Sequence, residues 1–108
     1  MNAKVQNIAR EFERRLSAHY GKRLAKLVLY GSQARGDAEE TSDIDVLVVL
    51  NEPFSFETER LAIGDIAYDL SFANGVLISC AIESADRFDD ETYKTPFLRN
   101  VRREGIAL

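Results

Sequence analysis

Apolar residues recur at helical spacing in two long stretches of the chain, with charged residues between them. Positions three or four apart share one face of a helix, so each stretch predicts an amphipathic helix. The first covers about residues 3–19 and ends at Gly21. Ser55 can cap the second, and Gly75 ends it. The expected buried positions of the two helices are Val5, Ile8, Ala9, Phe12 and Leu16, and Leu61, Ile63, Ile66, Ala67, Leu70 and Ala73.

Short, nearly continuous apolar runs predict strands between and after these helices. They cover Leu27–Tyr30, residues 43–50 and Val76–Ile82. A last helix is expected to start at Pro96, because proline suits the first turn, and to carry apolar residues as far as Ile106.

The alternation of helices and strands predicts the α/β class, with a small sheet covered by helices. Beyond Asp45 the second strand is apolar on both of its faces, which is typical of a strand buried on both sides. With 108 residues, the chain is long enough for one hydrophobic core and too short for two, so residues 1–108 are expected to form a single domain.

Composition and charge narrow the functional classes. Apolar residues make up 45% of the chain and charged residues 30%, as in a globular protein, and no apolar run has the length of a membrane span or signal peptide. The net charge is −4, and the acidic excess lies in residues 27–93 between two basic ends. A nucleic-acid-binding domain would normally be basic, so we expect neither nucleic-acid nor membrane binding. The single Cys80 is expected to be a buried thiol in a reducing cytoplasm.

Candidate chemistry lies in one short segment between the first two strands. Gly31-Ser32 forms a turn after the first apolar run, and Asp43 and Asp45 stand at the head of the second. Alternate strand residues share a face, so the two carboxylates should project together, roughly 7 Å apart along the chain. Paired carboxylates repel each other unless a cation lies between them, and oxygen ligands suit Mg²⁺ or Mn²⁺. The segment therefore predicts a site for a metal–nucleotide complex, with backbone N–H groups of the turn near the phosphates.

Two commoner nucleotide motifs do not fit this segment. Gly31 and Gly36 have the spacing of a P-loop, but Asp37 and Ala38 stand where lysine and serine or threonine must follow. The chain also lacks the G-x-G-x-x-G fingerprint of dinucleotide-binding folds.

The segment resembles a known family. Gly31-Ser32, ten further residues and Asp43-x-Asp45 resemble the signature of the polymerase-β-like nucleotidyltransferase superfamily. The fuller form, Gly-Ser-x-Ala-Arg-Gly with Ser-Asp-Ile-Asp-Val-Leu-Val, is similar to its minimal nucleotidyltransferase branch. The resemblance covers about twenty residues and implies a small mixed β-sheet flanked by helices, the palm-like fold of that superfamily.

The resemblance also implies a role for each matching residue. Gly31 and Ser32 would hold the β- and γ-phosphates of ATP, and Asp43 and Asp45 would bind Mg²⁺, which neutralises charge as pyrophosphate leaves. Arg35 would add positive charge at the triphosphate or order the loop, or it forms only a surface ion pair.

One part of the family pattern is missing. Active members usually offer a third carboxylate from a neighbouring strand, which serves as general base or second-metal ligand. The third predicted strand has no acid inside it, and Glu83 at its end is the candidate for this catalytic role.

We expect no room in the chain for a further domain that would hold an acceptor, so the acceptor is expected on a separate chain or on a second copy of this one. Minimal nucleotidyltransferases of this type are typically antitoxins that place AMP on a tyrosine of a HEPN-type toxin, with which they form a hetero-oligomer. One alternative is a non-catalytic module that neutralises its partner by contact alone. Another is the detached catalytic subunit of a small-molecule nucleotidyltransferase.

For several residues outside the motif, the sequence gives weaker support for a functional role. Arg99, Arg102 and Arg103 can share a helix face that is either solvated or binds an acidic partner. Tyr30 borders the site and is either the last core residue of its strand or a modified tyrosine. His19 is the chain's one histidine and has no companion ligand nearby in sequence, so we expect a structural or exposed role.

Overall fold

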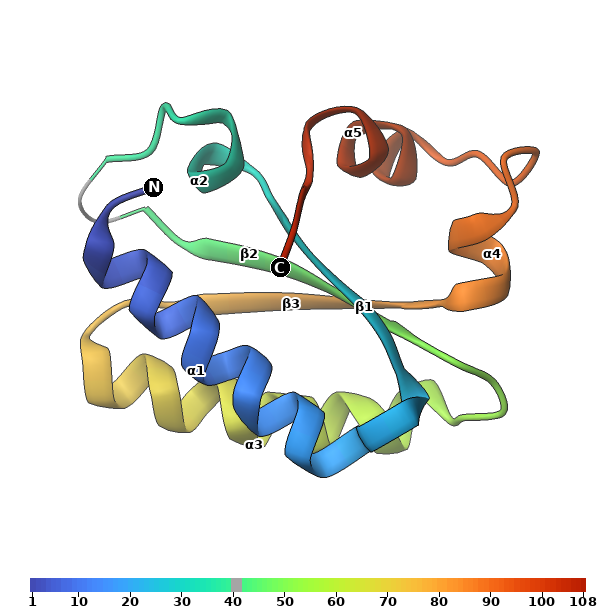
Figure 1. The fold of residues 1–108 in the computed structure, drawn as a ribbon, viewed down its shortest axis with the longest axis horizontal. Coiled ribbons are helices and arrows are strands. Elements are labelled where there is room, and N and C mark those ends of the chain that lie inside the picture. Colours follow the sequence, from blue (N-terminus) through green and yellow to red (C-terminus); the bar gives the residue numbers. More distant parts are fainter. Residues whose placement is uncertain (40–41) are drawn as a thin grey trace.

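The computed structural model describes residues 1–39 and 42–108 (Figure 1). The elements follow one another as α1 (Ala3–Tyr20), the 3₁₀ turn η1 (Gly21–Arg23), β1 (Leu24–Tyr30), α2 (Ser32–Arg35), β2 (Ile44–Leu50), α3 (Phe56–Asn74), β3 (Ile78–Ser84), α4 (Ala85–Asp89), α5 (Pro96–Glu104) and β4 (Ile106–Ala107). No helix in the described part of the chain is both long enough and apolar enough to cross a membrane.

The four strands form one mixed sheet in the order β3-β2-β1-β4. β1 is antiparallel to both β2 and β4, whereas β2 and β3 are parallel and joined by the long crossover helix α3. Helices cover both faces, which confirms the predicted α/β class with a small mixed sheet (Figure 1). β2 lies inside the sheet, and its residues Val46–Leu50 are all buried, as its two apolar faces predict.

Helices α1 and α3 pack side by side on one face of the sheet and enclose the larger core (Figure 1). Both begin where the sequence predicts: Asn2 Oδ1 accepts a hydrogen bond from the Val5 N–H, and Ser55 Oγ accepts one from the Thr58 N–H. The apolar positions predicted for the first helix are all buried. In the second helix Leu61 and Ala73 are exceptions, because both are exposed, and Leu61, at 69%, turns away from this core.

A buried carboxylate ties these two helices together. Glu59 of α3 is 6% exposed and accepts hydrogen bonds from the Tyr20 hydroxyl at 2.8 Å and the Arg23 guanidinium at 3.2 Å. Burial and this carboxylate both raise the pKa of Tyr20. The spacing of apolar residues gave no sign of this contact, because Glu59 is charged, although it lies one turn before Ile63 on the buried face of α3.

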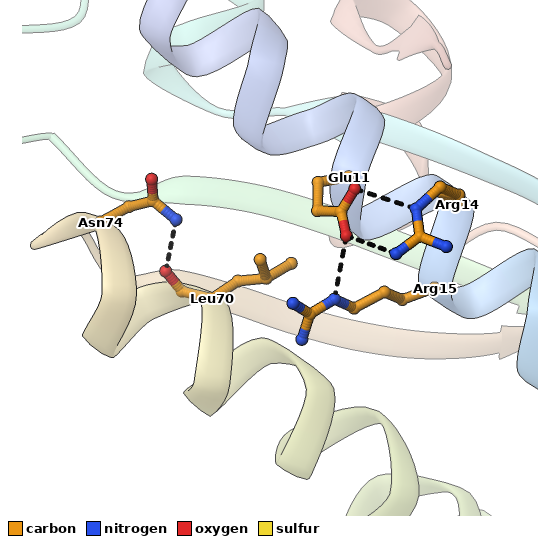
Figure 2. A network of polar contacts seen from close by, with 5 residues as sticks. All are labelled: Glu11, Arg14, Arg15, Leu70 and Asn74. Carbon is orange, nitrogen blue, oxygen red and sulfur yellow. Dashed lines mark hydrogen bonds and ion pairs between the residues drawn. The ribbon is translucent and has the colours of Figure 1, made fainter.

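Polar contacts on the outer surface of this layer are local. Glu11 accepts hydrogen bonds from Arg14 at 2.6 Å and Arg15 at 3.1 Å, one helical turn away (Figure 2). These two guanidinium groups hold the pKa of Glu11 at about 2. At the end of α3, the Asn74 side chain donates to the Leu70 carbonyl at 2.9 Å, which satisfies a terminal carbonyl of the helix (Figure 2).

The opposite face of the sheet is covered by α4 and α5, which enclose a smaller core. Arg102 of α5 turns inward and donates to the carbonyls of Tyr93, Phe88, Arg87 and Asp90 at 2.8–3.3 Å. It therefore holds the connection between the two helices in place. The prediction of a solvated or partner-binding arginine face is wrong for Arg102, whereas Arg99 and Arg103 are exposed.

β1 starts at Leu24 rather than Leu27, and β3 ends at Ser84 rather than Ile82. Two further boundaries differ from prediction for a tertiary reason. β3 starts at Ile78 rather than Val76, because its pairing with β2 begins at Ile44. Ile106 lies in β4 rather than at the end of the last helix, since residues 106 and 107 pair with Leu29 and Val28 of β1. A two-residue strand such as β4 depends on its partner strand, so its own sequence gives no signal.

Candidate active site

The end of the β1–β2 hairpin brings the candidate residues together. β1 ends at Tyr30 and β2 begins at Ile44, and their antiparallel register pairs Tyr30 with Asp45. Asp45 shares a face of the sheet with Leu47, which packs in the smaller core, so its side chain lies on the side of α4 and α5. Asp43 comes two residues earlier and is exposed, whereas Asp45 is half-buried.

Gly31 makes the close approach that this arrangement requires. Its φ of 75° is positive, and a Cβ built on it would collide with the Asp45 carboxylate. A side chain is therefore excluded twice, by conformation and by space. Ser32 follows as the first residue of α2, a single helical turn that ends at Gly36. The backbone of the turn thus lies directly against one carboxylate of the pair, as the spacing predicts.

The loop that joins α2 to β2 is braced at both ends. Gln33 is 6% exposed, and its side-chain amide donates to the Ser42 carbonyl at 3.4 Å. Ser42 Oγ accepts a hydrogen bond from the Glu39 N–H at 2.8 Å, so Ser42 contributes to this bracing through its side chain as well. Sequence reasoning missed Gln33, since a polar residue in a polar turn gives no sign of burial. Residues 40 and 41 of the predicted loop lie outside the described part of the chain.

Arg35 at the end of α2 is exposed and forms ion pairs with Asp37 at 3.2 Å and Glu104 at 3.5 Å. Of the roles considered for it, the surface ion pair is the one observed here. Its charge still reaches the carboxylate pair, because it lowers the pKa of Asp45. Binding of a triphosphate by Arg35 stays a prediction.

The carboxylate pair is electrostatically strained. Burial raises the pKa of Asp45, and the neighbouring Asp43 raises it further, against the smaller opposing effect of Arg35. Burial and Asp45 also raise the pKa of Tyr30, whose ring packs edge-on against Phe97 with centroids 5.2 Å apart. A cation at this place would relieve the repulsion between the two carboxylates.

The two carboxylates suit a hard divalent cation that is coordinated partly by the protein and partly by a bound nucleotide. Among the described residues, no group of three His, Cys, Asp or Glu side chains could hold a metal ion. Asp43 and Asp45 therefore offer two oxygen donors, and the remaining positions would fall to water and to phosphate oxygens. Mg²⁺ commonly binds in this way, through one or two carboxylates together with a nucleotide.

The predicted third carboxylate does not join the site. The parallel register pairs Asp45 with Ser79, whereas Glu83 is opposite Val49, four residues or about 13 Å further along the strand. One Glu83 oxygen accepts a hydrogen bond from the Ser84 N–H at 2.8 Å. The structure therefore does not bring Glu83 to the carboxylate pair, because the register puts that end of the strand far from Asp45, and a catalytic role for Glu83 stays a prediction. Ser79 stands beside Asp45 instead, so a row of Tyr30, Asp45 and Ser79 crosses the sheet.

Comparison with known proteins agrees with this arrangement. The nucleotidyltransferase domain family matches residues 8–104. The Methanocaldococcus jannaschii protein named "Putative protein adenylyltransferase MJ0604" is 36% identical over 99 residues, which are 92% of each chain. A solved structure named "putative minimal nucleotidyltransferase" is 28% identical, with a TM-score of 0.56 over 96% of this chain and 95% of that one.

A second solved structure has the same fold at lower identity. It is a "toxin-antitoxin with AMP-PNP", 18% identical, with a TM-score of 0.57 over 90% of this chain and 69% of that one. The fold, the hairpin geometry and the match over nearly the whole length lead to one conclusion. The chain belongs to the nucleotidyltransferase domain family, and its homologues include minimal nucleotidyltransferases.

Proposed function

We propose that the chain is an antitoxin-type protein adenylyltransferase, which moves AMP from Mg²⁺-ATP to a tyrosine hydroxyl of a HEPN-type toxin and so neutralises it. The observation that carries this proposal is the contact between Gly31 and Asp45. It sets a glycine turn against a pair of carboxylates in a nucleotidyltransferase fold. That pairing of a phosphate-binding turn with a metal-binding pair is what nucleotidyl transfer requires.

In this proposal each residue acts mainly by position and charge. The turn at Gly31 and Ser32 orients the triphosphate, while Asp43 and Asp45 hold the metal ion. When bound, Mg²⁺ supplies neutralisation of the charge that develops on the phosphates. The acceptor oxygen attacks the α-phosphorus, a new O–P bond forms, the bond to pyrophosphate breaks, and the hydroxyl proton is released to water. Catalysis therefore depends on alignment and electrostatic stabilisation.

The choice of a protein acceptor rests on the relatives. MJ0604 carries the name of a protein adenylyltransferase and matches this chain over nearly its whole length. The structural neighbour solved with AMP-PNP is a toxin–antitoxin complex. The toxin's HEPN class and the tyrosine come from the family resemblance in the sequence.

The test is an intact-mass measurement of two purified chains. The protein is incubated with Mg²⁺-ATP and the product of its neighbouring gene, and both masses are recorded. We expect the partner to gain whole AMP units, and the Asp43→Asn variant to transfer none. Asp89→Asn is the matched control, because it removes an equally exposed carboxylate in α4 and should leave transfer unchanged.

One observation favours a second function, that of a module which neutralises its partner by binding alone. Beside Asp45 the neighbouring strand offers Ser79, a hydroxyl, rather than a carboxylate that could take the acceptor's proton. If the toxin stays neutralised with the Asp43→Asn and Asp45→Asn variants, and no mass change occurs, binding alone is the function and the transferase proposal fails.

A further inference from the structure

A group of exposed apolar side chains lies along α3 and the start of β3, on the edge of the molecule. Leu61, Tyr68, Phe72 and Leu77 are 69%, 68%, 81% and 57% exposed. The first three share one face of α3 because they are seven and four residues apart, and the rings of Tyr68 and Phe72 stack with centroids 6.3 Å apart. We call these four residues the α3–β3 patch. A contiguous apolar surface of this kind is typical of a protein-binding site.

An open groove of about 270 Å³ runs beside the patch, between α3 and the edge strand β3. Gly64, Tyr68 and Ser71 line it from the helix, and Leu77 and Cys80 line it from the strand side. Cys80 is half-buried rather than fully buried as predicted, and burial followed by the charge of Asp45 raises the pKa of its thiol to about 12. The thiol is therefore unreactive, and the groove wall is mainly apolar, with Arg60 at its margin.

Gly64 points to what the groove receives. It lies in the interior of the 19-residue helix α3, where glycine lowers helix stability. A Cβ built on it would meet nothing within 4 Å, so no contact inside this chain requires glycine there. A missing side chain on an exposed helix face allows a second helix to approach closely.

The edge of β3 favours a helix over an added strand. β3 is the last strand of the sheet on this side, so one of its edges faces away from β2. At Ile78, however, the backbone N–H donates to Ser71 Oγ of α3 at 2.9 Å. A strand added at this edge would need that donor. The groove therefore suits side chains packed against it rather than a backbone ladder.

Charge favours a basic partner over a second copy of the chain as the occupant. Asp65 and Asp69 are exposed on α3 and follow the patch on one flank. A two-fold contact through the patch would place the acidic flanks of both copies in one interface, where like charges are unfavourable. Basic residues on the occupant would instead pair with both carboxylates.

We propose that the α3–β3 patch and its groove bind an amphipathic helix of the partner protein, with an apolar face against Gly64 and basic residues beside Asp65 and Asp69. Leu77 is two residues from Ser79, which pairs with Asp45, so a partner bound here lies next to the end of the sheet that carries the site. The identity of the partner as the acceptor protein rests on the proposed function.

The test measures binding separately from transfer. The purified chain is titrated calorimetrically with the product of its neighbouring gene, without ATP. We expect Gly64→Leu, which fills the groove, and Phe72→Ser each to raise Kd by about tenfold or more. Asp69→Lys should weaken binding as well, and added salt should reduce the difference between Asp69→Lys and the native chain. Ile106→Ser is the matched control, an exposed apolar residue of β4 at the opposite edge of the sheet.

Circular dichroism and the thermal shift with Mg²⁺-ATP show that each variant is folded and binds nucleotide. Unchanged affinity in Gly64→Leu and Phe72→Ser would overturn the inference, and so would the absence of any complex. A concentration-dependent doubling of the chain's own mass that Gly64→Leu abolishes would assign the patch to a second copy. A patch-dependent complex in which no AMP is transferred would leave the inference standing and reject the transferase function instead.

Discussion

At the scale of single residues, the site depends on one glycine. Gly31 has a positive φ, and its backbone lies where a side chain would collide with Asp45. Gly36, at the other end of α2, also has a positive φ of 82°, but a Cβ there would meet nothing within 4 Å. A comparison of Gly31 with Gly36 therefore separates two free-energy costs of a side chain: that of a positive φ and that of a collision with Asp45.

We expect Gly31→Ala to lower the free energy of unfolding by about 1–3 kcal/mol, because strain and collision add. Gly36→Ala should cost about 1 kcal/mol, the penalty for the left-handed conformation alone. Urea denaturation followed by circular dichroism measures both values. Equal losses in the two variants would show that the contact with Asp45 carries no energetic weight.

The carboxylate pair and the glycine turn could be predicted from the sequence, because they lie within one short segment whose local spacing decides which side chains meet. The position of Glu83 relative to the site could not be predicted in this way, since its distance from Asp45 depends on the register between β2 and β3. Gln33 and Glu59 were missed because burial of a polar side chain depends on partners far along the chain.

At the scale of elements, the helices were predictable and the short pairings were not. The first helix and its cap follow from periodic apolar residues and Asn2 or Gly21 at its ends, which are local signals. β4 forms only through its pairing with β1. The inward position of Arg102 depends on the path of the connection between α4 and α5, whose carbonyls it contacts. Leu61 was expected to be buried from the spacing of apolar residues, but it lies on the exposed side of α3.

The clamp that Arg102 forms gives a test at this scale. Its planar guanidinium reaches several carbonyls at once, which a lysine ammonium cannot do. We expect Arg102→Lys to lower the free energy of unfolding by about 1–3 kcal/mol. Arg103→Lys is the control, since Arg103 is exposed and bonds only to Asn100 in the described structure. If chemical denaturation gives the same midpoint for both variants, the clamp is not a stabilising feature.

At the scale of the whole molecule, ligand binding and folding are linked through the site. The proposed metal–nucleotide complex contacts the end of β1, the turn at Gly31 and the head of β2, which exist together only in the folded chain. Any ligand that binds the folded form alone stabilises it by mass action.

We expect Mg²⁺-ATP at about one hundred times its Kd to add about 2.7 kcal/mol to the free energy of unfolding, which raises Tm by about 10 °C. EDTA should reverse the shift. Asp43→Asn should abolish it, and Asp89→Asn should leave it intact. Differential scanning fluorimetry gives all four values. A shift that persists in Asp43→Asn would place the nucleotide elsewhere on the molecule.

The pairing of Tyr30 with Asp45 means that one strand register determines both the position of the carboxylates and the packing of the core. Neighbouring residues of β2 point to opposite faces, so a slip of one residue against β1 would turn Asp43 and Asp45 toward the apolar core under α1 and α3 and move Val46 and Val48 out of that core. A mutation that loosened this register would lose the fold before it could relocate the site. Natural variation in this chain should therefore alter what approaches the carboxylates, and leave their placement alone.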